Sequence, residues 1–551
     1  MQRLALAAFG LLASWLGACS APAELILHGG SIYTLDSTQP VVAAVAVRNG
    51  RVLAIGELAD LKRYRDASTE MVDLAGRPLY PAFADAHLHL TGIGLARMRV
   101  DLTGTTSERE VVTRAATAAA ALPAGAWLQG RGWDQNDWPI QEFPTHEALS
   151  AALPDRPAAL GRVDGHALLA NAAAMRAAGV NAQTPDLPGG RILRDAAGEP
   201  TGVFVDAAMG WIERAVPPPT TEELERGMLL AQEELHRRGI VAVHDAGIGA
   251  REVRLYENFA RSGALQLRVH AMLDGSDEAL MEEWFARGPE PDFLGLGVLA
   301  VRAIKLYADG ALGSRGALLL EDYADEPGNH GLLITSRPRF DEVCAAARRT
   351  GFQVCTHAIG DGGNRLVLDA YEAAGASDGR WRIEHAQVLH PDDVWRFARL
   401  GVIPSMQAQH QTSDMPWATA RLGEERARGA YAWRWLLDAG CIIPGGSDAP
   451  VERLDPIAAF VAAVTRSTLA GDPPGGWHPE QCMTRPEALR HLTFWPAAAA
   501  FRETDLGRIA PGCRADFVLL SADLMTAPAS ELRAVQVVRT YFAGQQVYPA
   551  R

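Results

Sequence analysis

Eight apolar, strand-like runs alternate with helical patterns along the chain, and this alternation constrains the fold more than any other feature. The runs are Pro81–His89, Ile240–His244, Leu267–Met272, Arg302–Leu306, Gln353–His357, Trp381–His385, Val402–Met406 and Ile442–Ser447. Amphipathic stretches such as Thr220–Arg238 and Pro391–Leu400 fall between them. Strands that alternate with helices are typical of a parallel sheet. Eight βα units predict an α/β fold, a (β/α)8 TIM-like barrel with its active site at the carboxyl ends of the strands.

The two ends of the chain have a different pattern, made of short strands and turns. Asn49-Gly50 between apolar alternations is a strong hairpin signal. Strand-like runs also occupy 515–520 and 535–547. Neither cluster is large enough to form a good core alone. We therefore expect residues 19–79 and 505–551 to form one small β-sandwich domain, with the barrel spanning 80–504.

A long segment, about 100–219, does not fit a single βα crossover. It contains strand-like runs near Trp133 and 158–163, and it ends in three consecutive prolines, Pro217 to Pro219. We interpret it as an insertion after the first strand that folds over the barrel mouth. Insertions and loops of this kind commonly carry specificity.

The N-terminus has the pattern of an export signal. Arg3 precedes an apolar run, 4–16, that is too short to span a bilayer. The ending Leu16-Gly17-Ala18-Cys19 resembles a bacterial lipobox, which implies removal of residues 1–18 and lipidation of Cys19. Ser20 then favours the outer membrane. We expect an exported protein, lipid-anchored in the cell envelope and facing the periplasm; a plain signal peptide is the alternative.

Composition limits the partners. Hydrophobic residues make up 48% and charged residues 21% of the chain, as in a soluble globular protein. The net charge of -14 argues against nucleic acid or an anionic membrane surface as a partner. We therefore expect a small-molecule substrate and membrane contact only through the lipid anchor. A homo-oligomer is left open.

Two histidines stand at the end of the first predicted barrel strand. Side chains alternate along a strand, so His87 and His89 point to the same side. Neutral imidazole is the commonest metal ligand, and two on one strand supply half of a tetrahedral zinc site. Taken alone, the pair could equally be two ordinary strand histidines.

Later strands add further candidate ligands in barrel order. His357 and His385 each end a strand, and Asp448 ends the last one. Lys305 lies within an apolar strand, where a protonated ammonium is costly. A desolvated lysine is nucleophilic and can react with carbon dioxide to give a carbamate that bridges two metals. The alternatives are a plain cation at Lys305, paired with Asp309 or a substrate carboxylate, and a helix N-cap at Asp448.

These motifs together resemble the amidohydrolase superfamily, in its type 3 subgroup, which includes N-substituted formamide deformylases. The resemblance covers nearly all of Glu24 to Val547. Its motifs are Gly132-Trp133-Asp134, Arg162-Val163-Asp164-Gly165-His166, Val243-His244-Asp245-Ala246-Gly247, 305–317, His357-Ala358-Ile359-Gly360-Asp361, Ile383-Glu384-His385-Ala386-Gln387 and Gly446-Ser447-Asp448-Ala449-Pro450.

The resemblance implies a role for each candidate ligand. His87, His89 and Asp448 would bind one divalent metal, His357 and His385 a second, and carboxylated Lys305 would bridge the two. The metal would be zinc, with two ions if Lys305 is carboxylated and otherwise one. Asp448 would also act as the general base and then protonate the departing nitrogen.

Other motif residues are candidates for substrate binding. They are Trp133, Asp134, His166, His244, Asp309 and Arg315, each of which could instead serve packing or ordinary solvated interactions. His330, His390, His410 and His478 are predicted to lie in polar loops without a partner at ligand spacing, and we assign them no role.

The leading functional hypothesis is a metal-dependent hydrolase that cleaves an amide or related non-peptide C–N bond of a small molecule. A deaminase on the same barrel is the nearest rival, but such deaminases carry a glutamate three residues after the fifth-strand histidine, where this chain has Gly360. A dipeptidase stays open, because Arg315 or Arg382 could bind a free carboxylate. A non-catalytic, lipid-anchored binding protein is the alternative from another class.

Overall fold

The computed structural model describes residues 22–123, 125–163, 165, 167–187, 190–376 and 379–550. The predicted signal peptide, Cys19 and His166 lie outside the described residues. Within these ranges, no helix has both the length and the apolar character needed to cross a membrane.

Seven parallel strands form the central barrel sheet, in the order β18-β17-β16-β15-β14-β13-β6. Their bounds are β6 (Phe83–Leu88), β13 (Ile240–Ile248), β14 (Arg268–Asp274), β15 (Leu299–Tyr307), β16 (Gln353–Ala358), β17 (Arg382–His385) and β18 (Ile403–Ser405). Each contains most of one predicted run. The TIM-like α/β barrel is therefore confirmed.

The eighth predicted run, Ile442–Ser447, closes the barrel without forming a regular strand. Ala86 N–H donates to the Gly445 carbonyl (2.8 Å) on one side, and Met406 N–H donates to the Pro444 carbonyl (3.1 Å) on the other. Pro444 has no N–H to give to a ladder. A Cβ at Gly446 would lie 2.6 Å from the His87 backbone nitrogen, so glycine permits a very close approach to β6.

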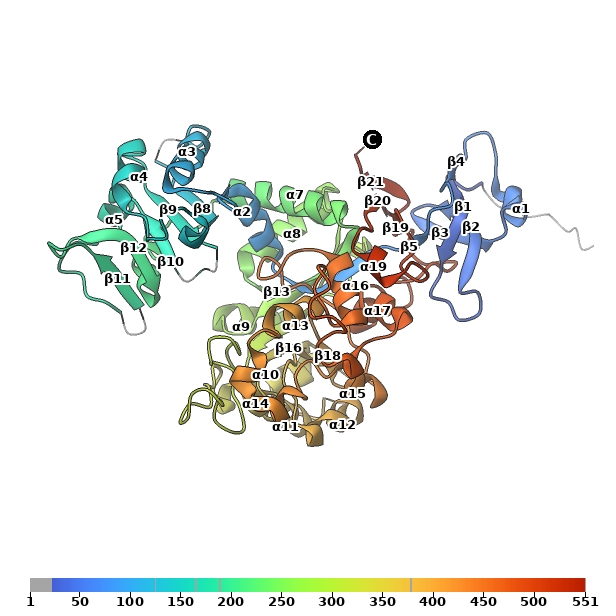
Figure 1. Cartoon of the computed structure of the whole chain (residues 1–551). Coiled ribbons are helices and arrows are strands. Elements are labelled where there is room, and N and C mark those ends of the chain that lie inside the picture. Colours follow the sequence, from blue (N-terminus) through green and yellow to red (C-terminus); the bar gives the residue numbers. More distant parts are fainter. Residues whose placement is uncertain are drawn as a thin grey trace, which may run out of the picture.

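Helices cover the outside of the barrel (Figure 1). Pro391–Leu400 is a helix over its predicted range, and the predicted Thr220–Arg238 helix spans Thr221–Arg237, which a capping box from Thr220 begins. The helices of this part of the chain are α2 (Leu90–Met98), α7 (Thr221–Arg237), α8 (Ala250–Ser262), α9 (Glu278–Arg287), α10 (Arg337–Thr350), α11 (Asp361–Ala373), α12 (Pro391–Leu400), α13 (Ala408–Asp414), α14 (Ala418–Ala427), α15 (Trp433–Asp438), α16 (Pro456–Thr465), α17 (Arg485–His491) and α18 (Phe494–Ala499).

Helix α2, directly after His89, packs unusually close to α7. A Cβ on Gly94 would lie 2.0 Å from the Gly227 carbonyl oxygen, whereas a Cβ on Gly227 would lie 3.4 Å from Gly94, an ordinary contact. We expect Gly94→Ala to destabilise the protein by about 1–3 kcal/mol, because one of the two helices must move. Gly227→Ala is the matched control and is expected to be neutral. Thermal unfolding measures both, and equal midpoints would contradict this packing.

The two ends of the chain share one eight-stranded sheet. It consists of β1 (Leu25–Tyr33), β2 (Val41–Arg48), β3 (Arg51–Gly56), β4 (Glu70–Asp73), β5 (Leu79–Pro81), β19 (Phe517–Leu520), β20 (Val537–Phe542) and β21 (Gln545–Tyr548), with the short helices α1 (Leu58–Leu61) and α19 (Ala529–Leu532) on the same segments. The antiparallel pairing of β5 with β19 joins the N-terminal strands to the C-terminal ones. All eight strands belong to one hydrogen-bonded sheet. A sandwich requires two sheets packed face to face, and that part of the interpretation stays a prediction.

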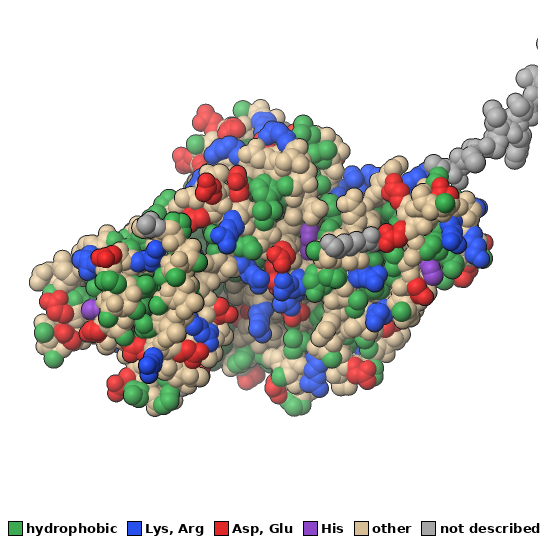
Figure 2. Space-filling model, turned by 90° about the horizontal axis from the view of Figure 1, so that it is seen from above, with side chains coloured by type: hydrophobic (Ala, Val, Ile, Leu, Met, Phe, Trp, Pro, Cys, Tyr) green, Lys and Arg blue, Asp and Glu red, His purple; other side chains and the backbone are tan. Residues whose placement is uncertain are grey.

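The insertion folds as a unit with its own sheet, in the order β11-β12-β10-β9-β8-β7. Its elements are β7 (Val100–Asp101), α3 (Glu108–Ala119), β8 (Leu128–Trp133), α4 (His146–Ala152), β9 (Ala158–Arg162), β10 (Ala167–Ala170), α5 (Ala172–Ala177), β11 (Gly190–Arg194), β12 (Pro200–Asp206) and α6 (Gly210–Glu213). It has hydrophobic clusters of its own. In both views it forms a separate lobe beside the barrel (Figures 1 and 2). That it covers the barrel mouth stays a prediction.

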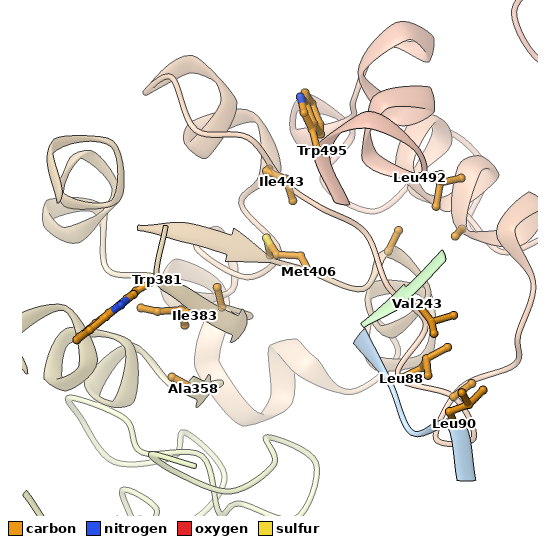
Figure 3. Close-up of a cluster of buried hydrophobic side chains, with 14 of the residues drawn as sticks. Leu88, Leu90, Val243, Ala358, Trp381, Ile383, Met406, Ile443, Leu492 and Trp495 are labelled. Carbon is orange, nitrogen blue, oxygen red and sulfur yellow. The ribbon is translucent and has the colours of Figure 1, made fainter. Parts of the chain in front are cut away.

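Apolar side chains next to the candidate ligands pack in the hydrophobic core around the barrel strands. Leu88, Ala358 and Ile383 each neighbour or nearly neighbour a candidate ligand in sequence, and all three belong to the largest buried cluster. Figure 3 shows Leu88 beside Val243 of the neighbouring strand. Alternation along the strands therefore places apolar residues in this packing layer and leaves the polar ones for the interior.

Candidate metal centre

His87 is held by a buried ion-pair network on β17. Its Nδ1 donates to Glu384 Oε2 at 2.6 Å, and Arg382 Nε lies 2.7 Å from Glu384 Oε1. Burial raises the pKa of the Glu384 carboxyl, but Arg382 and His87 outweigh that effect and hold this pKa well below its ordinary value. Burial, assisted by Lys305, lowers the pKa of His87 to about 4. His87 is therefore a neutral imidazole whose Nε2 lone pair faces the site.

His89, which directly follows β6, also directs its Nε2 at the site. Its Nδ1 donates to the Ala246 carbonyl at 3.0 Å, and its Nε2 lies 3.2 Å from Asp448 Oδ1. The side chain is half-buried, with 36% of its surface exposed. The Nε2 atoms of His87 and His89 therefore both approach one oxygen of Asp448, which lies 3.7 Å from the first of them.

Asp448 occupies a strained position between the histidines. Its φ of +59° is left-handed, a conformation that costs a non-glycine residue about 1–3 kcal/mol and clusters at functional sites. Burial raises the pKa of this carboxyl, but the hydrogen bond to His89 and the nearby His87, His385 and His410 lower it well below its ordinary value. No described helix begins at Asp448, so the N-cap interpretation is wrong.

His385 and His357 face the site from β17 and β16. His385 Nδ1 donates to Gln407 Oε1 at 2.8 Å, which leaves its Nε2 free as an acceptor. The ring centres of His357 and His385 are 4.6 Å apart. His385 follows Glu384 directly, and an ordinary strand would point the two in opposite directions. Positive φ values at His385 (+74°) and Ala386 (+42°) break that alternation.

Lys305 lies at the bottom of the site on β15 and is 1% exposed. Its Nζ donates to His87 Nε2 at 3.3 Å. Burial lowers the pKa of Lys305 to about 8, although Glu384 and Asp448 act in the opposite direction. Burial thus favours the uncharged amine more at Lys305 than at a solvated lysine.

The donor set fits a divalent metal. His87, His89 and Asp448 offer ligand atoms within 4.8 Å of one another, and so do His385, His410 and Asp448. Nitrogen and carboxylate oxygen donors of this kind suit zinc and similar ions. His357 lies outside both groups but beside His385. The structure thus brings all six predicted ligand positions to one end of the barrel.

Two functional features escaped the sequence interpretation. Glu384 has no role in the sequence interpretation and Arg382 is considered there only as a carboxylate binder, although two opposite charges in a buried strand indicate a polar network. His410 had no assigned role, yet it is buried on α13 with Nε2 3.7 Å from Asp448 Oδ2. Nothing in its local pattern points to the barrel interior, because α13 only approaches the site after β18 ends.

The candidate substrate residues of the insertion lie within that lobe. Trp133 is fully buried and donates from Nε1 to the Leu160 carbonyl at 2.7 Å. Asp134 forms an ion pair with Arg162 at 2.9 Å. These contacts belong to the insertion itself.

The remaining candidates serve mainly the scaffold. His244 accepts a hydrogen bond from Arg382 at 2.7 Å through Nδ1, beneath the site. Asp309 is fully buried and accepts backbone N–H groups from Leu318, Ile359 and Gly360. It thus fixes the loop after His357. The guanidinium of Arg315 binds Asp325 at 2.9 Å.

Glu384 provides a test of the network behind His87. A carboxylate that accepts from a ligating imidazole fixes the ring and makes it more basic. We expect Glu384→Gln to weaken metal affinity about 10–100-fold, measured by competition with a chelator. Glu503→Gln, which alters a part-exposed pair with Arg380, is the matched control. Unchanged affinity in a folded Glu384→Gln protein would contradict this role.

A barrel that gathers histidines and an aspartate at one end is the architecture of a metal-dependent hydrolase, and the comparisons with known proteins agree. The profile of the amidohydrolase family matches residues 70–548. The chain therefore belongs to the amidohydrolase family.

Relatives match over almost the full length. The Bacillus subtilis protein YtcJ is 34% identical over 536 residues, 95% of this chain and 99% of its own. The N-substituted formamide deformylase of Arthrobacter pascens is 29% identical over 548 residues, 95% of this chain and 97% of its own. An uncharacterized metal-dependent hydrolase from Pyrococcus horikoshii, a crystal structure, superposes with a TM-score of 0.77 at 28% identity and covers 92% of this chain and 99% of its own. The protein is a hydrolase acting on carbon–nitrogen bonds.

Proposed function

We propose that the protein hydrolyses an amide or related non-peptide C–N bond of a small molecule at the centre formed by His87, His89, His357, His385 and Asp448. One observation carries this proposal. The Nδ1 atoms of His87, His89 and His385 each face a fixed acceptor, so the Nε2 atoms of all three rings converge on the same small region beside Asp448. Three imidazole nitrogens gathered around one carboxylate form a donor set suited to a divalent cation.

Asp448 moves the proton in this proposal. When bound, a divalent ion supplies a water acidic enough to attack near neutral pH and polarises the carbonyl. Asp448 accepts the proton as the water oxygen bonds to the carbonyl carbon, and returns it to the nitrogen as the C–N bond breaks. Its lowered pKa keeps the carboxylate ionised and ready as the base. The products are a carboxylic acid and an amine.

The metal count depends on Lys305. We propose two zinc ions bridged by a carboxylated Lys305. Its burial and its lowered pKa of about 8 support this, because carbon dioxide reacts with the neutral amine. The carbamate would also replace a cation next to His87 Nε2 by an anion.

Observations at three positions weigh against the rival enzymes. A Cβ at position 360 would lie 2.0 Å from the Leu318 carbonyl oxygen, so the glutamate of a deaminase has no room at Gly360. For a dipeptidase, Arg382 is fully buried in its pair with Glu384, and Arg315 is held by Asp325. The Arg382 guanidinium is therefore closed to a substrate carboxylate, and Asp325 competes with such a carboxylate for Arg315.

A formyl or other small acyl group on nitrogen is the substrate type that we propose, supported by the similarity to the N-substituted formamide deformylase. The test is a screen of zinc- or manganese-loaded protein against N-formyl amines, N-acyl amino acids, cyclic imides and dipeptides. Cleavage of the first class, abolished by a chelator, is expected. If no C–N bond is cleaved and chelation changes nothing, the proposal fails.

We also propose export and lipid anchoring through Cys19, supported by the Leu16-Gly17-Ala18-Cys19 motif. The expected result is that the full chain fractionates with membranes of a bacterial host, and that Cys19→Ala releases it into the soluble fraction. Equal fractionation of both would contradict the anchor.

A further inference from the structure

His410 is the one histidine beside Asp448 that the proposed mechanism does not use. It lies on α13 and is 8% exposed. Its Nε2 is shielded from solvent, has no hydrogen-bond partner, and lies 3.7 Å from Asp448 Oδ2. The ring stacks on that of His385, with 5.8 Å between centres. A buried polar atom without a partner is costly unless it serves a ligand.

The partner at the other ring nitrogen decides what Nε2 can do. The Nδ1 atoms of His87 and His385 face acceptors, so the Nε2 atoms of these two rings carry lone pairs. His410 Nδ1 instead faces the side-chain Nε2 of Gln387 at 3.2 Å, an amide that donates. A neutral imidazole that accepts at Nδ1 carries its proton at Nε2. His410 therefore offers an N–H where His87 and His385 offer a lone pair.

We propose that His410 is a catalytic hydrogen-bond donor to the reacting carbonyl oxygen, and that Gln387 is the positioning residue that fixes its tautomer. A protonated Nε2 has no lone pair for a metal. In this tautomer His410 is therefore not a ligand, although it lies close enough to His385 and Asp448 to be one. The proposal rests on the hydrolase function proposed above and adds a group that stabilises the charge developing in that reaction.

A hydrogen-bond donor near the reacting carbonyl would assist the chemistry proposed above. When water adds to the carbonyl, the carbonyl oxygen gains negative charge, and a preorganised donor in a dry site stabilises that charge. His410 stands on the Oδ2 side of Asp448, opposite the side that faces His87 and His89. Its proton stays on the ring throughout, so no proton transfer is added to the reaction.

The first test replaces the donor. We expect His410→Phe to lower kcat by about 10²–10³-fold, with the metal content of the purified protein unchanged. His410→Gln, whose amide can donate, should recover part of the loss and guards against a folding defect in the phenylalanine variant. A lower metal content in His410→Phe would show a ligand, and an unchanged kcat would show a spectator. Either result overturns the proposal.

The second test replaces the hydrogen-bond donor that faces His410 Nδ1 by an acceptor. Gln387→Glu presents an acceptor to His410, which moves the ring proton to Nδ1, and should reduce kcat nearly as much as His410→Phe. The comparison variant is Gln407→Glu, in which an acceptor stays opposite His385 Nδ1, and its loss should be at least about tenfold smaller. Equal losses in the two variants would overturn the role of Gln387.

A readout independent of turnover separates this inference from the proposed function. In protein labelled with ¹⁵N-histidine, the signals lost in His410→Phe identify the His410 ring. We expect them to show a bare Nδ1 and a protonated Nε2, with and without zinc. A protonated Nδ1 would overturn the inference even if C–N bonds are cleaved. If the tautomer is as expected but no substrate is cleaved, the proposed function fails instead.

Discussion

Asp448→Asn is expected to lower kcat by about 10²–10⁴-fold, the range for loss of a positioned general base. Asparagine keeps the size of the side chain but removes the charge and the site that accepts the proton. Asparagine also tolerates a left-handed backbone, so the φ of +59° at this position does not threaten the fold. The loss therefore reports chemistry and not unfolding.

The same variant separates the two roles of Asp448. If Asp448 acted only as a metal ligand, a higher zinc concentration would restore the activity of Asp448→Asn. If Asp448 acts as the base, the activity of this variant stays low even at saturating zinc. We expect the latter, measured as kcat against metal concentration. Asp369→Asn removes the same charge from an exposed pair with Arg396 and serves as the control. Recovery of full activity at high zinc would contradict the base assignment.

Lys305→Ala is expected to reduce the bound metal from about two ions to about one and to reduce activity strongly, since a bridging carboxylate holds both ions of a two-metal site. Of the variants considered, Lys305→Ala is expected to change the metal content most, because Lys305 is buried within the site beside His87. Metal analysis of protein prepared with and without bicarbonate measures it.

Lys305→Met separates the carbamate from simple packing. Methionine fills similar space without an amine, so its metal content should fall as in Lys305→Ala while its thermal stability stays closer to that of the natural protein. A short carboxylate such as acetate should restore part of the metal binding in Lys305→Ala by entering the space left by the side chain. One ion in the natural protein and in both variants would contradict the bridge.

The barrel could be predicted from the sequence because each strand is a short apolar run between helical patterns. The closing segment shows the limit of that reasoning. Ile442–Ser447 has strand-like apolar residues, but Pro444, Gly445 and Gly446 replace a regular ladder by a few hydrogen bonds and a close backbone approach. For the small β domain, the meeting of the two chain ends could be predicted, because neither strand cluster makes a core alone; the pairing of β5 with β19 could not, because it joins residues more than 400 positions apart.

The placement of the candidate ligands at one end of the barrel could also be predicted, because each lies at or near the carboxyl end of a predicted strand; their role as ligands stays a prediction. The residues that tune them could not be predicted. Glu384 contacts His87 across 297 positions of sequence, and His410 enters the site only through the path of α13 after β18. The direction of His385 depends on a left-handed φ that no local pattern indicates.

A crystal structure of zinc-loaded protein, with anomalous data at the zinc edge, tests the central claim most directly. We expect one peak within ligand distance of His87, His89 and Asp448 and a second beside His357 and His385, with continuous density from Lys305 between them. Zinc absent from this end of the barrel, or bound only elsewhere on the protein, would contradict the metal centre.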